Sequence, residues 1–249
     1  MKLHRLWLAL ALGAGCGLVN SNTLSYDYKF DPPQGFMESF GDSSNTATVP
    51  MVACDPMAST DECAALVPPS MLGAAKLSCD PTSRMCAAVV DVRLAYPIDL
   101  SMQSLPAPVV QYGVDKVSID KIAYWIMNKT VNVDIPPIDL YVAAAAAKDE
   151  TDASAKLVGT VSKLPASSTA CTDAADPDVD QTAKTQMASV CDVKLTDTGQ
   201  SALAAFVKDY KTPFQFIAHT KVVAHAGDPL PTGQLSFYVR PWVKFSVLN

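Results

Sequence analysis

The sequence has few of the residues that usually carry catalysis. Only three of its 249 residues are histidines, and charged residues make up 18% of the chain. It contains no Walker A loop and no Gly-x-Ser-x-Gly nucleophile motif. No two cysteines are separated by two residues, the spacing typical of zinc fingers. We predict that the chain is not an enzyme, because it holds no convincing set of catalytic residues.

The sequence also lacks an apolar run of the roughly 20 residues that a transmembrane helix needs. The N-terminal apolar run, residues 6–12, is much shorter. It follows Lys2 and Arg5 and is itself followed by small residues. This order is typical of a secretion signal peptide, which we predict over residues 1–15.

The tetrad Gly13-Ala14-Gly15-Cys16 resembles the lipobox of bacterial lipoproteins, with Gly13 in place of the usual leucine. The resemblance implies that the chain is cut before Cys16 and that a diacylglyceryl group is attached to the Cys16 thiol. It also implies the outer membrane, because Gly17 stands where aspartate commonly signals inner-membrane retention. Palmitate is then an expected acyl chain. The alternative is an ordinary signal peptide cut nearby, which leaves Cys16 as a free thiol.

Removing Cys16 leaves an even number of cysteines, which outside the cytoplasm indicates disulfides. Spacing favours local bridges between Cys54 and Cys63, between Cys79 and Cys86, and between Cys171 and Cys191. The first four could also pair as 54 with 79 and 63 with 86. Zinc is the competing use of these cysteines, and their spacing disfavours it.

The net charge excludes one class of partner. Without residues 1–15, the chain keeps 17 basic and 25 acidic residues, a net charge of −8. An acidic chain is repelled by phosphate backbones, so we predict no nucleic-acid partner. Because 49% of the residues are apolar, we expect a folded chain rather than a disordered one.

Most of the chain alternates apolar and polar residues, the pattern of half-buried strands. We expect two or three strands within residues 114–134, an edge strand from residue 138, loop over 35–50, and Pro241 at an edge or bulge. The expected strand regions are 26–30, 88–100, 114–134, 138–147 and 157–164, with a C-terminal hairpin of 214–224 and 235–247.

One segment has helical spacing instead. Leu203, Phe206, Val207 and Tyr210 fall on one face of a helix, which we predict over about 197–210. Asp197 is the expected N-cap, with Gln200 three residues later as in a capping box.

Residues 122–142 lead from an apolar stretch through an asparagine-containing corner into a second apolar stretch. They resemble the sandwich domains of late-embryogenesis-abundant type 2 proteins, and the resemblance implies an immunoglobulin-like or fibronectin-like sandwich. We therefore predict a mainly β fold, an antiparallel β-sandwich of that kind with one amphipathic helix and a disulfide-stapled insertion. The expected organisation is a signal peptide (1–15), a lipidated tether (16–25), an N-terminal strand and loop (26–50), a Cys-rich stapled insertion (51–88) and a sandwich domain (89–249).

The strongest metal-binding candidates are Asp176, Asp178 and Asp180, which match the first three ligand positions of an EF-type calcium loop. Gln181 stands where that loop needs glycine, and Met187 stands where it needs glutamate. A solvated acidic loop is the favoured interpretation, so we predict no metal or cofactor, and calcium is the alternative.

Two other groups contain residue types that bind metals or catalyse hydrolysis. His219 and His225, with Asp228 nearby in sequence, could hold a metal only if a turn brought further carboxylates close. Asp197-Thr198-Gly199 spells the aspartic-protease triplet, but it occurs once and a protease needs two. We predict no catalytic residue in either group.

These observations predict an exported protein anchored to the membrane through Cys16, with a structural, adhesive or assembly role and a protein partner in the cell envelope. The first alternative is a lipoprotein that binds calcium, a glycan or a small molecule. The second is a hydrolase with an unrecognised site.

Overall fold

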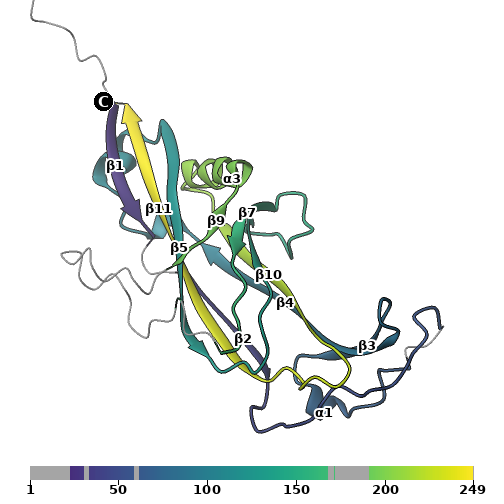
Figure 1. Ribbon diagram of the computed structural model, residues 1–249. Coiled ribbons are helices and arrows are strands. Elements are labelled where there is room, and N and C mark those ends of the chain that lie inside the picture. Colours follow the sequence, from purple (N-terminus) through teal and green to yellow (C-terminus); the bar gives the residue numbers. More distant parts are fainter. Residues whose placement is uncertain (1–22, 31–33, 59–61, 168–170, 172–190, 249) are drawn as a thin grey trace, which may run out of the picture.

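The computed structural model describes residues 23–30, 34–58, 62–167, 171 and 191–248. Within them the chain forms two antiparallel sheets that face each other, with helices at the margins (Figure 1). The predicted antiparallel β-sandwich is therefore confirmed. Among the described residues, no helix combines the length and the apolar character that crossing a membrane requires.

The first sheet is built around the long C-terminal strand β11 (Gly233–Leu248). Along one side, β11 pairs with β5 (Lys116–Lys129), which in turn pairs with β8 (Cys191–Asp192). Along its other side, β11 pairs first with β2 (Gln34–Gly41) and then with β1 (Thr23–Lys29).

Pro241 lies in this central strand, so the predicted position at a sheet edge is wrong. Pairing with β2 ends at Val239, and pairing with β1 begins at Trp242. The Pro241 carbonyl accepts a hydrogen bond from the Phe30 amide at 3.1 Å, so the proline faces the interval between β1 and β2. A missing N–H donor disrupts no ladder there. The register shift against β5 that follows, between Trp242 and Val243, fits the predicted bulge.

The second sheet has six strands in the order β3, β4, β10, β6, β7, β9. The predicted edge strand from residue 138 is wrong, because β6 lies between β10 and β7. The bounds are β3 Lys76–Asp80, β4 Met85–Ile98, β10 Phe214–Ala224, β6 Ile138–Ala144, β7 Lys156–Val161 and β9 Lys194–Leu195.

A short segment joins the two sheets at one side of the sandwich. Cys191 and Asp192 pair with β5 of the first sheet, and Lys194 and Leu195 pair with β7 of the second. Between them, the Val193 amide donates to the Ile122 carbonyl at 2.8 Å, and the Val193 side chain is buried. The five consecutive residues 191–195 thus connect the two layers.

Three local predictions differ from the structure. Residues 34–41 form β2 instead of a loop, and residues 116–129 form one continuous strand instead of two or three. The predicted C-terminal hairpin is also wrong. β10 pairs with β4 and β6 whereas β11 lies in the other sheet, because the apolar faces of both strands are needed on opposite sides of one core.

The predicted amphipathic helix is α3 (Asp197–Lys208), with Leu203 and Val207 buried. Its N-cap is Thr196 rather than the predicted Asp197, and the Thr196 hydroxyl accepts from the Gly199 amide at 2.9 Å. Gly199 permits close packing, because a Cβ there would lie 2.4 Å from the Val158 Cα. The remaining helices are short: α1 (Pro69–Leu72), α2 (Ala107–Tyr112) and the 3-10 turn η1 (Leu100–Met102).

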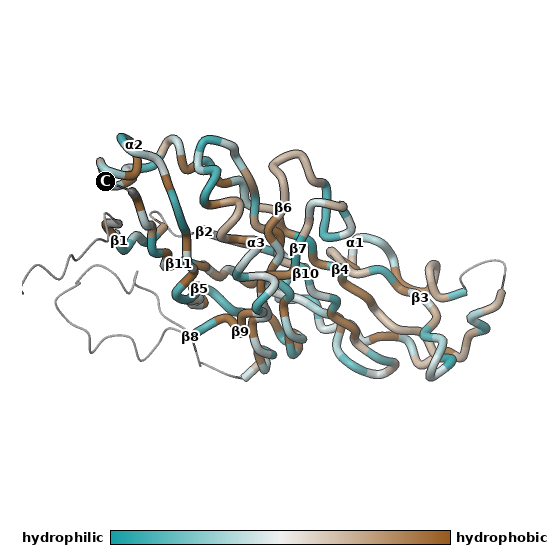
Figure 2. The backbone as a smooth tube through the Cα atoms, turned by 90° about the horizontal axis from the view of Figure 1, so that it is seen from above, coloured by the Kyte–Doolittle hydropathy of each residue, from teal (hydrophilic) through white to brown (hydrophobic). Residues whose placement is uncertain are grey.

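The molecule is elongated, and its two ends differ. Thr23 pairs with Leu248, so the start and the end of the described chain lie side by side, near α2 (Figure 2). β3 and α1 lie toward the opposite end, as Figures 1 and 2 both show.

Candidate functional site

Two disulfides hold together the end of the molecule that carries β3 and α1. Residues 51–58 and 62–86, which we call the stapled tip, contain bridges from Cys54 to Cys79 and from Cys63 to Cys86. The favoured local pairings, 54 with 63 and 79 with 86, are therefore wrong, and the crossed alternative is right.

The fold of the tip explains the crossed pairing. Cys79 and Cys86 already face each other in the β3–β4 ladder, which holds those two strands together without a bridge. The Cys54 amide donates to the Arg84 carbonyl at 3.0 Å, and the Cys86 amide donates to the Val52 carbonyl at 3.0 Å. These bonds lay the preceding loop along the hairpin, so both bridges tie the loop to the sheet.

The sulfur atoms of Cys54, Cys63 and Cys86 lie within 4.8 Å of one another and are buried. Zinc binds cysteine as thiolate. Because all three sulfurs belong to disulfides, this cluster is a pair of adjacent bridges and offers no thiolate.

The tip exposes large apolar side chains next to these bridges. Met57 is 88% exposed and Met51 is 77% exposed, and both lie in the loop that the bridges fix. Val52, Leu66 and Met71 are exposed to about 40% each. Unbranched methionine side chains adapt to irregular surfaces, which suits them to contact a partner protein.

A hollow of about 370 Å³ lies beside the tip on the outer face of the six-stranded sheet. Two of its lining residues are His225 and Asp80, and His225 Nδ1 lies 3.9 Å from Asp80 Oδ2. Hydrogen bonds from the Thr82 amide and the Ser83 hydroxyl lower the pKa of Asp80 below its ordinary value. The hollow is lined by Ser78, Cys79, Asp80, Pro81, Ala87, Val89, Lys221, Val223 and His225.

The structure does not bring His219 and His225 together as metal ligands. His219 Nε2 lies 3.0 Å from Asp91 Oδ1, and Nδ1 lies 3.6 Å from Glu150 Oε1. Arg93 bonds to both carboxylates, at 2.6 Å to Asp91 and 3.0 Å to Glu150. Burial alone would raise the pKa of Asp91, but the bonds from His219 and Arg93 outweigh it and lower that pKa. With arginine as the counter-ion, this cluster is a surface ion-pair network.

Asp228, the third residue considered with these histidines, has a structural role. Its carboxylate accepts from the His225 backbone amide at 2.9 Å and so closes the turn after β10. Among the described residues, no group of histidines and carboxylates has the convergence that a metal ion requires.

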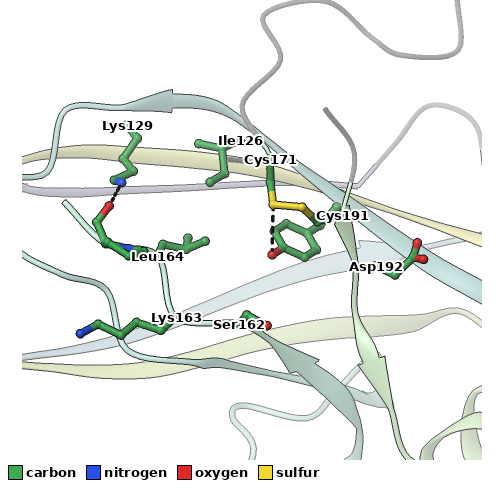
Figure 3. Close-up of a pocket in the computed structure, with 10 residues that line it drawn as sticks. Ile126, Lys129, Ser162, Lys163, Leu164, Cys171, Cys191 and Asp192 are labelled. Carbon is green, nitrogen blue, oxygen red and sulfur yellow. Dashed lines mark hydrogen bonds between the residues drawn. A yellow bond between two sulfur atoms is a disulfide. The ribbon is translucent and has the colours of Figure 1, made fainter. Parts of the chain in front are cut away.

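The third disulfide, Cys171 to Cys191, is as predicted and borders a pocket of about 250 Å³ (Figure 3). The Tyr124 hydroxyl lies 3.4 Å from Cys171 Sγ, and because a disulfide sulfur carries no proton, the hydroxyl is the donor. Burial raises the pKa of Tyr124. On the far side of the pocket, Lys129 donates to the Pro165 carbonyl.

The remaining predicted site residues lie apart from these features. Asp176, Asp178, Asp180 and Cys16 lie outside the described residues. Asp197 lies in the first turn of α3, where its negative carboxylate interacts favourably with the positive end of the helix dipole.

The sequence did not predict the exposed apolar side chains of the stapled tip. It identified the cysteines, but it did not identify the methionines between them. The signal that could have found these is the density of methionine in a short proline-rich stretch, with Met51, Met57 and Met71 in positions that no strand or helix pattern assigns to the core.

Comparison with known proteins finds no matching family model, no similar curated protein and no similar solved structure.

Proposed function

We propose that this chain is an exported protein of the cell envelope, anchored in the outer membrane through a lipid on Cys16. In this proposal its role is structural, adhesive or in assembly, and it binds a protein partner through the stapled tip.

The observation that carries the proposal is the position of Thr23 relative to the tip. Thr23 begins the described chain at one end of an elongated sandwich, and the stapled tip lies at the other. A lipid on Cys16, seven residues earlier, therefore favours an orientation in which the tip points away from the membrane. Disulfides fit this setting, because they persist in exported proteins.

The surface of the tip supports a partner of protein type. Met51 and Met57 lie in a loop that two bridges hold in place, so little conformational entropy is lost when a partner covers them. The hollow beside the tip could accept a partner side chain.

The anchor is tested by metabolic labelling with palmitate. Wild-type protein should incorporate the label and fractionate with the outer membrane, and the Cys16→Ser variant should lose both properties. Wild-type protein without label would overturn the lipid anchor, whatever its location.

The partner surface is tested by a photo-crosslinking amino acid placed at Met57 in intact cells. The matched control places it at Ala205, an exposed position on α3 away from the tip. We expect one dominant covalent protein adduct at position 57 and none at 205, and its disappearance when Met51 is changed to aspartate. Equal crosslinking at both positions would count against a binding role for the tip.

A further inference from the structure

At the end of the molecule opposite the tip, a second group of apolar side chains is exposed. We call Leu24, Met102, Val110 and Tyr112 the terminal patch. Their exposed fractions are 42%, 83%, 60% and 53%. The patch is separate from the tip and comes from β1, η1 and α2.

Contacts place the patch beside the start and the end of the described chain. The Asp115 amide, just after α2, donates to the Ser246 carbonyl at 2.9 Å, two residues before Leu248. The Tyr28 hydroxyl donates to Gln103 Oε1 at 2.6 Å, which ties η1 to β1. Met102 therefore lies on a segment attached to β1, and Val110 and Tyr112 lie on a segment attached to β11, the strand that pairs with β1.

The segment that supplies most of the patch carries no charge. Residues 100–114 contain no Asp, Glu, Lys, Arg or His. An uncharged surface with valine, methionine and tyrosine can enter the boundary between lipid headgroups and acyl chains, because no ion has to be desolvated. The next two residues, Asp115 and Lys116, are exposed charges of opposite sign that can stay at the level of the headgroups, with Lys116 beside the phosphate groups.

The length of the tether limits how far Thr23 can lie from the membrane. The seven residue steps from Cys16 to Thr23 span at most about 25 Å. The 16 residues of β11 alone extend roughly 50 Å away from Leu248, the residue paired with Thr23. A lipid at Cys16 thus keeps the terminal patch within reach of the bilayer, whereas the far end of β11 reaches it only when the long axis lies parallel to the membrane.

We propose that the terminal patch rests on the lipid surface that holds the Cys16 anchor, so that the domain stands on the membrane instead of swinging freely on its tether. This inference rests on the proposed lipid anchor. Its occupant is the bilayer itself, contacted through Met102, Val110 and Tyr112.

The test compares two methionines of similar exposure at opposite ends. In the full lipidated chain, Met102→Cys and Met57→Cys are each labelled with an environment-sensitive NBD fluorophore. Both are reconstituted into vesicles of phosphatidylethanolamine and phosphatidylglycerol with brominated acyl chains. We expect several-fold stronger quenching and a blue-shifted emission at position 102, and the aqueous spectrum at position 57.

A second variant protects the result against an effect of the label. Changing both Val110 and Tyr112 to aspartate should abolish the quenching at position 102 while the chain still floats with the vesicles. Equal spectra at positions 102 and 57 in a chain that floats would overturn the inference and leave the anchor intact. A chain that does not float at all would overturn the anchor, and the inference with it.

Discussion

The end of the molecule that carries Thr23 and Leu248, here the terminal end, and the stapled tip are stabilised in different ways. At the terminal end, seven residue pairs join β1 to β11, and the rings of Tyr28 and Phe245 lie 5.9 Å apart. At the tip, α1 has four residues and β3 has five, and two disulfides tie the loop to the sheet. At the tip, the covalent bridges fix a loop that has no long strand ladder of its own, because an unbridged loop would keep much of its conformational entropy.

The largest expected effect comes from removing a tip bridge. Changing both Cys63 and Cys86 to alanine should lower the free energy of unfolding by about 3 kcal/mol. The bridge closes a loop in the unfolded chain, and its removal restores the conformational entropy that this closure takes away. Denaturant titration measures the loss. Hydrogen exchange should show lost protection at residues 51–86 and retained protection in the β1–β11 ladder.

The matched control changes Cys171 and Cys191 to alanine, a bridge of similar sequence separation outside the tip. It should leave exchange at the tip unchanged. A uniform loss of protection at both ends in the Cys63 and Cys86 variant would mean that the bridge stabilises the whole domain and not the tip in particular.

A smaller effect is expected where the sandwich depends on packing alone. Gly199→Ala places a Cβ about 2.4 Å from backbone atoms of Leu157 and Val158, so α3 must move away from β7. We expect a loss of about 2 kcal/mol in the free energy of unfolding. Thermal and denaturant unfolding measure it.

Ser201→Ala, at an exposed position of the same helix, serves as the control and should change stability by no more than about 0.5 kcal/mol. If Gly199→Ala were equally silent, close packing of α3 on β7 would not contribute to stability.

The smallest expected effect concerns Glu38 on β2, which lies in the same alternating set as the buried Phe36 and Phe40. Burial raises the pKa of Glu38 above its ordinary value of 4.5, so the folded protein disfavours the ionised carboxylate. Stability of the wild type therefore falls as pH rises from about that value through the raised pKa.

Glu38→Gln should accordingly be more stable than the wild type at neutral pH, by about 0.5 kcal/mol. The difference should vanish at a pH well below 4.5, where the wild-type carboxyl is protonated in both states. Melting temperatures across this range measure it, with Glu62→Gln at the exposed tip as the control. A difference that stayed constant with pH would refute the burial effect.

The sequence predicted the strands whose apolar residues alternate without interruption, such as β4 and β10, because burial of one face is encoded locally. It missed β2, because Glu38 occupies an inward position between Phe36 and Phe40 and breaks the pattern. It divided residues 114–134 into two or three strands, whereas β5 is continuous and accommodates Asp120 by a register shift against β11. The helix was correct, and its cap was misplaced by one residue because Thr196 and Asp197 can both cap.

The candidate site was less predictable than the fold. Which cysteines pair at the tip depends on the loop of Val52 and Cys54 lying along the β3–β4 hairpin, a contact between segments about 30 residues apart. Spacing alone carries no information on that contact. The terminal patch depends likewise on α2 meeting the end of β11, which is far away in sequence.

The antiparallel pairing of β1 with β11 also determines how the domain resists a pull. A force applied at Thr23 acts along β1, and the hydrogen bonds to β11 run perpendicular to that direction. All seven residue pairs from Thr23 to Lys29 are then loaded in shear at once, instead of opening one after another from a free end. A domain pulled at this strand can carry tension along its long axis without first unfolding at the point where the force is applied.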